Sequence, residues 1–164
     1  SMTINPSQSL FFDSQEIYDY HLGEMYSNYN TCVKVVSVLK DNFPNEIFAL
    51  KKNTINITTK RNSRLCKDLS GGHLAHYHQS KPPRICIRQK FLKSPECWSM
   101  NRYGEIFGGV KRMVSSKGII AIVDLMCHEV AHHRTKGHGN RWKLKYAKFL
   151  HFMINKIISG EFYQ

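Results

Sequence analysis

Hydrophobic and polar positions divide the chain into a helical first part, a short region of strands and a helical last part. A helix is predicted from Ser14, a suitable cap, to about Gly23. A second helix is predicted over residues 30–41, where apolar residues recur at helical spacing and Pro44 prevents continuation. Residues 1–13 lack such a pattern, so they are predicted to form a loose tail.

Three short segments in the middle of the chain have the alternation or β-branched content of strands. They are residues 55–58, residues 73–78 after a Gly-Gly pair, and residues 84–88 after a Pro-Pro pair. Together they predict a small antiparallel sheet. Residues 94–117 are rich in glycine, serine and turn formers, so they are predicted to be loop with at most a short helical turn.

Two further helices are predicted in the last third of the chain. The first begins at Ser115 or Ser116 and runs to about Arg134, and the second covers residues 140–159. Their apolar stripes are Ile119, Ile122, Val123, Met126 and Val130 in the first, and Trp142, Tyr146, Phe149, Met153 and Ile157 in the second. The whole pattern predicts an α+β fold with one domain over residues 14–164.

The composition suits a soluble intracellular protein. A length of 164 residues suits one domain with its own core, and we find neither the layout of a signal peptide nor an apolar run long enough to span a membrane. The five cysteines are odd in number, widely spaced and without a CxxC pair, which argues against a disulfide framework and fits a reducing compartment. Cys127 lies beside the motif described below but is predicted to be a buried filler.

Charge is distributed unevenly along the chain. Residues 1–50 contain two Lys/Arg and six Asp/Glu, a net charge of −4, whereas residues 51–164 contain 22 and six, a net charge of +16. A positive field of this size favours polyanionic partners, and nucleic acid or a protein bound to nucleic acid is the expected one. Scattered basic residues that serve only solubility are the alternative.

The residues His128-Glu129-Val130-Ala131-His132 form an HExxH string within a predicted helix. Residues four apart lie on one helix face, so His128 and His132 can bind one metal ion, while Glu129 can face a water molecule at that ion. Zinc is the expected metal. With the zinc ion activating water and polarising a carbonyl, Glu129 is predicted to act as the general base of a hydrolase.

His138 is predicted to be the third metal ligand. Gly137 can take a positive φ and let the chain turn back after His132. A carboxylate ligand is the alternative, but only Glu161 follows the motif. The neighbouring His133 is predicted to be solvated or to face phosphate.

A further donor for the oxyanion of a peptidase reaction is expected as well. Tyr103, His151 and Arg141 are the candidates, and the sequence does not choose among them.

The HExxH string, five residues, His138 and then Trp142 resemble the SprT-like and WLM zinc metallopeptidases, including their YgjP-type relatives. The resemblance covers about residues 80–160 in layout and about fifteen residues in specific motif. It implies a minimal zincin-like metallopeptidase domain, with a small sheet, the HExxH helix and a closing C-terminal helix. It also implies a zinc metalloendopeptidase that acts on DNA-bound or DNA-crosslinked proteins, and so a role in DNA repair.

Two other functions stay open from the residues alone. The YbeY-type nucleic-acid hydrolases use three histidines at the same spacing but have a glycine where this chain has Glu129. A non-catalytic module, stabilised by zinc and binding nucleic acid, would have no use for Glu129 as a base. Metzincins share the histidine spacing but have a glycine at the position of Thr135.

Basic residues and a second group of histidines complete the candidate contacts. His73, His76 and His78 are interpreted as polar positions on a half-exposed strand, with a second metal site or a substrate contact as the alternative. An edge strand can pair with an extended substrate, but the sequence does not show whether the edge is residues 73–78 or 84–88. The residues expected to contact nucleic acid or substrate are Arg84, Arg88, Lys90, Arg134, Lys136 and Arg141.

Overall fold

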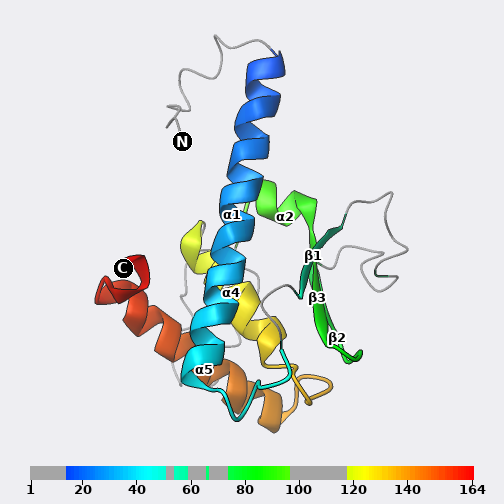
Figure 1. The fold of residues 1–164 in the computed structure, drawn as a ribbon, viewed down its shortest axis with the longest axis vertical. Coiled ribbons are helices and arrows are strands. Elements are labelled where there is room, and N and C mark those ends of the chain that lie inside the picture. The colour runs from blue at the N-terminus through cyan, green and yellow to red at the C-terminus, as the bar shows by residue number, and fades with distance from the viewer. Residues whose placement is uncertain (1–13, 51–53, 59–65, 67–73, 97–117) are drawn as a thin grey trace.

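The computed structural model describes residues 14–50, 54–58, 66, 74–96 and 118–164, with side chains in the first helix from residue 23 onward. The predicted tail at 1–13 and nearly all of the predicted loop at 94–117 lie outside these residues. The described residues form a small α+β fold with a three-stranded mixed sheet (Figure 1).

The first helix, α1 (Ser14–Asn42), is one continuous element, so the prediction of two helices separated near Gly23 is wrong. A glycine inside a helix costs only about 1 kcal/mol relative to alanine. Burial of apolar side chains in the C-terminal half of α1 offsets this cost. These side chains form a stripe of Cys32, Val35, Val36 and Leu39. Burial of this stripe outweighs the local preference of one glycine.

The sheet contains β1 (Ile55–Thr58), β2 (Ala75–His78) and β3 (Arg84–Arg88) in the order β1-β3-β2. The predicted strands are confirmed, with β2 beginning two residues later than expected. The antiparallel arrangement is only half right, because β2 pairs antiparallel with β3 but β1 pairs parallel with it. The long connection between β1 and β3 lets the chain return to the same end of the sheet, as a parallel pair requires.

A short helix, α2 (Gln89–Lys93), follows β3 directly and was not predicted. Helix α4 (Ile119–Val130) contains the HExxH motif's first residues. Every residue from Ala121 to Cys127 is buried, so α4 is covered on all sides and does not have the single apolar stripe that was predicted. A helix that is apolar all round belongs in the interior of a domain.

Helix α5 (Asn140–Ile158) closes the fold, and a 3₁₀ turn, η4 (Glu161–Tyr163), follows it. Four of the five predicted stripe residues of α5 are buried and Ile157 is half-buried. In Figure 1, α4 and α5 lie against the C-terminal half of α1, and the sheet stands to one side of them. Among the described residues, no helix has the length and apolar character that crossing a membrane requires.

Candidate metal centre

The HExxH motif lies where α4 ends. The helix stops at Val130, four residues before the predicted end at Arg134, and the chain continues in tight turns. The amide of His132 donates to the carbonyl of Glu129 at 3.0 Å, so the chain still winds by one turn beyond the helix. His128 and His132 therefore remain one above the other, with ring centroids 5.2 Å apart.

His138 returns to these two histidines through the turn that contains Gly137. Gly137 has a φ of 71°, the positive value that the sequence predicted. The His138 ring centroid lies 5.0 Å from that of His128 and 4.9 Å from that of His132. The Nε2 atoms of His138 and His128 are 3.2 Å apart. The three histidines are thus close enough to hold one metal ion, with candidate ligand atoms all within 4.8 Å of one another.

His132 is oriented by the main chain around it. Its Nδ1 lies 3.1 Å from the carbonyl oxygen of Thr135, so the Nδ1–H tautomer can donate there and leave Nε2 toward the other histidines. Burial lowers the pKa of His132 to about 4, and its ring is therefore neutral near pH 7. A neutral imidazole with a free Nε2 is the form that binds metal.

Glu129 is buried beside the histidines. Its Oε1 lies 3.6 Å from Nε2 of His128, and its side chain is only 5% exposed. Among the described residues, Oε2 of Glu129 has no hydrogen-bond partner. Burial raises the pKa of this carboxyl to about 8. This value applies without a metal ion, and the positive charge of a bound metal would lower it. A buried carboxyl beside a potential metal site, with one oxygen unused, is a candidate for proton transfer.

Trp142 forms the floor under the three histidines. Its ring centroid lies 4.6–4.7 Å from those of His138 and His128, and its plane is stacked on His132. Its indole N–H donates to the carbonyl oxygen of His128 at 3.1 Å. Tyr146 stacks beneath Trp142 at 5.0 Å and donates its hydroxyl to Asp124 of α4. Helix α5 therefore fixes the site from below through aromatic contacts.

His133 does not face solvent or phosphate, so that prediction is wrong. It is 2% exposed, and its Nδ1 lies within hydrogen-bond distance of the Tyr77 hydroxyl on β2. Burial lowers the pKa of His133 to about 4, so the neutral ring can accept this bond. Lys145 donates to the carbonyl of His133 and, at 3.2 Å, to the hydroxyl of Thr135. This buried network joins the sheet, the turn after α4, and α5.

A pocket of about 460 Å³ opens at the three histidines. One wall is β2, and the amide of Gln79 just after it donates to the carbonyl of His132 at 2.6 Å. Within the described sheet β3 is central and β2 lies at an edge. Of the two candidate edge strands, the one at the pocket is therefore β2 and not β3. The lining residues are Ala75, His76, Tyr77, His78, Gln79, His128, Glu129, His132, Thr135, Lys136, Gly137 and His138.

The basic residues expected to contact nucleic acid lie in two places. Lys136 is exposed and lines the pocket, and Arg134 and Arg141 are exposed on the same turn and the start of α5. The Arg134 guanidinium also lies 4.4 Å from the ring centroid of Phe48. The second group follows the sheet: Arg84 and Arg88 are half-buried on β3, and Lys90 is exposed on α2.

The other site predictions have mixed outcomes. His151 lies on α5 beside a different pocket, and Arg141 is not among the residues that line the pocket at the histidines. Tyr103 and His73 lie outside the described residues. Glu161 pairs with Lys156 in the C-terminal turn, away from the site. Cys127 is fully buried, as predicted.

Signals for the residues that sequence reasoning missed were weak. Gln79 and Tyr77 reach the turn after α4 from a distant strand, and only their place beside His76 and His78 could have indicated them. Comparison with protein-family models, curated proteins and solved structures gives no match for this chain.

Proposed function

We propose that this protein is a zinc-dependent peptidase that cleaves proteins associated with DNA. The observation that carries the proposal is Glu129, a buried carboxyl with an unused oxygen beside three convergent histidines in one open pocket. A site that held metal only for structure would have no use for this carboxyl, because an unpaired buried carboxyl destabilises the fold.

The histidines fit zinc. Two nitrogens bound to one tetrahedral zinc at about 2.0–2.1 Å are roughly 3.3 Å apart, and the Nε2 atoms of His128 and His138 are separated by 3.2 Å. His128, His132 and His138 would hold the ion, and a fourth position would remain for water or substrate. When bound, zinc supplies Lewis acidity that activates water and polarises a carbonyl.

Glu129 performs the proton transfers in the proposed reaction. It accepts a proton from the attacking water and delivers it to the nitrogen of the leaving amine as the peptide bond breaks. The Thr135 carbonyl holds His132 in the required tautomer, and Trp142 keeps all three rings in place.

The pocket is shaped for an extended peptide. Among the described strands β2 lies at an edge, and it forms one wall of the pocket, so a substrate segment can add to it through main-chain hydrogen bonds and bring its scissile carbonyl toward the three histidines. Lys136 lines the pocket, and Arg134 and Arg141 are exposed on the neighbouring turn and at the start of α5, so these residues add positive charge to this side of the protein. With the net charge of +16 over residues 51–164, these residues favour a substrate held near phosphate.

The test is cleavage of a DNA-binding protein, such as a histone, by zinc-loaded protein with and without single-stranded DNA. Cleavage that requires both zinc and Glu129, and that DNA accelerates, is expected. Glu129→Gln removes the base while it keeps the size of the side chain. Glu46→Gln, at a carboxyl paired with Lys148 outside the pocket, is the matched control.

Two outcomes would overturn the proposal. Cleavage by Glu129→Gln at the wild-type rate would show that this carboxyl is not the base. Zinc binding without cleavage of any protein, combined with hydrolysis of RNA, would assign the site to nucleic-acid hydrolysis instead.

A further inference from the structure

A second group of metal-binding side chains lies at the edge of the sheet, outside the three-histidine site. His76 and His78 are two apart on β2, so their side chains lie on the same face of the strand. Their ring centroids are 4.5 Å apart. Cys66, ten residues before His76 in the sequence, joins them, and the candidate ligand atoms of all three residues lie within 4.8 Å of one another.

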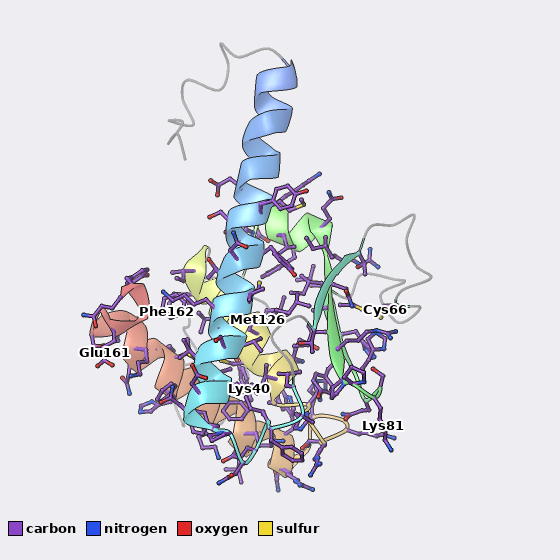
Figure 2. All side chains as sticks on the ribbon, viewed as in Figure 1. Lys40, Cys66, Lys81, Met126, Glu161 and Phe162 are labelled. Carbon is purple, nitrogen blue, oxygen red and sulfur yellow. The ribbon has the colours of Figure 1, made fainter. Side chains whose placement is uncertain are left out.

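The sheet register places this group away from the apolar core. His76 is opposite Cys86 on β3, and His78 is opposite Arg84, so all four side chains lie on one face. Tyr77, between the two histidines, points to the other face, where its hydroxyl contacts His133. Figure 2 shows Cys66 beside the strands, on the side opposite α1.

Cys66 is buried although it lies outside the main apolar core. Cys66 is only 2% exposed and packs with Cys86, which is fully buried, in a small cluster separate from the main core. His76 and His78 are half-buried and also line the pocket at the three histidines. The imidazoles of His76 and His78 therefore lie between the buried sulfur of Cys66 and the pocket.

One thiolate and two imidazoles form a donor set for borderline or soft metal ions. Zinc binds Cys and His in structural and catalytic sites, whereas magnesium and calcium require oxygen ligands. Three protein ligands would leave a fourth coordination position for water or another ligand, and two of the three, His76 and His78, line the pocket. The chemistry therefore excludes a calcium or magnesium site.

We propose that Cys66, His76 and His78 hold a second zinc ion, at the wall of the pocket next to the three-histidine centre. This site has a sulfur ligand, and the first has nitrogen ligands alone. The second zinc ion would hold His76 and His78 in place on β2, the strand along which a substrate would lie. The proposal stands on its own ligands and does not require the first site to be a peptidase.

Cobalt substitution tests the proposal because a thiolate bound to Co²⁺ gives an intense charge-transfer absorption in the near ultraviolet, which imidazole ligands do not give. The reduced full-length protein, stripped of metal and titrated with Co²⁺, is expected to show this band. Cys66→Ser and His78→Ala should lose it, and His132→Ala should keep it. Metal analysis after zinc loading should find two equivalents in the wild type and one in each of these variants.

Cys86→Ser is the matched control, since Cys86 is the neighbouring buried thiol. It should keep the band, and thermal unfolding should show that each variant is folded before its metal content is compared. Absence of a thiolate band in the folded wild type would overturn the proposal. So would a band that Cys86→Ser abolishes and Cys66→Ser retains. A single zinc equivalent that only His132→Ala removes would overturn it while leaving the first site intact.

Discussion

The two histidine clusters of this protein are built in different ways. His128, His132 and His138 come from one stretch of chain, with spacing set by the helix end and the turn at Gly137. The second cluster, called the Cys66 cluster, consists of Cys66, His76 and His78. It combines two alternate residues of strand β2 with a cysteine that precedes the strand. Each cluster comes from a short stretch of chain, but only the first follows a known spacing motif, HExxH with a third histidine, whereas no such motif marks Cys66, His76 and His78.

The two clusters also differ in what supports them. The first stands on an aromatic floor of Trp142 and Tyr146, and its His132 is held by the Thr135 carbonyl. The second lies on the sheet, with Cys86 and Arg84 opposite its histidines. Single substitutions can therefore distinguish the two clusters, and they are ordered below by the size of the expected effect on cleavage or on stability.

The largest effect is expected from Glu129→Gln, which removes the proposed base from the first cluster. Loss of a general base lowers the rate of hydrolysis by about 10²–10⁴-fold, and zinc content should not fall, because the three ligands remain. Steady-state peptide cleavage and metal analysis check this. Glu46→Gln should cleave at the wild-type rate, and equal rates for the two variants would contradict the assignment.

Removal of the aromatic floor should have the next largest effect. Trp142 is fully buried against all three histidines, so Trp142→Ala is expected to lower the free energy of unfolding by about 3–5 kcal/mol. Urea unfolding measures the loss. Leu144→Ala on the same helix, at a side chain that is 68% exposed, should change it by less than about 0.5 kcal/mol. Similar losses for both would mean that Trp142 does not support the site.

The pH dependence of stability without metal isolates the cost of burying Glu129. Its pKa rises from 4.5 to about 8 in the folded protein, and burial is the cause. Below pH 4.5 both folded and unfolded states are protonated, so there is no cost. As pH rises toward 8 the unfolded state loses its proton first, and stability falls.

Glu129→Gln lacks this titration, so in chelator the variant should be more stable than the wild type at pH 8. Each pKa unit corresponds to about 1.4 kcal/mol, and an advantage of a few kcal/mol is expected. The advantage should shrink toward zero as pH falls below 4.5. Urea unfolding across this range tests it, and a difference that does not vary with pH would contradict the buried, uncharged carboxyl.

A smaller effect is expected at Tyr77, which lies on β2 between His76 and His78. Tyr77→Phe removes the hydroxyl that bonds to buried His133 and should destabilise the fold by about 1–2 kcal/mol, because His133 loses its partner. The thiolate band of the cobalt protein should not change, since Tyr77 points away from the Cys66 cluster. Tyr26→Phe, at an exposed tyrosine, is the control, and equal stability for the two variants would count against the network.

Local patterns in the sequence predicted much of the fold and most of the first site. The strands at 55–58 and 84–88, helix α5 and the positive φ of Gly137 follow from alternation, helical register and glycine's freedom. The spacing of HExxH and His138 indicated which three histidines meet. These features depend on residues within one or two turns of each other.

Features that depend on distant contacts were missed or wrong. Burial of the α1 stripe carries the helix through Gly23, and the parallel pairing of β1 depends on how a long connection returns. The burial of His133 depends on Tyr77 of β2, which is 56 residues away. The Cys66 cluster is close in sequence, but no known spacing motif marks it. No local pattern specifies such partners.

We propose that the three histidines form one metal centre and that the Cys66 cluster forms a second, different one. Anomalous diffraction at the zinc absorption edge, from crystals of zinc-loaded protein, tests it most directly. We expect two peaks, one among His128, His132 and His138 and one among Cys66, His76 and His78. A map without a peak among the first three histidines would contradict the account, and a peak there alone would refute the second site.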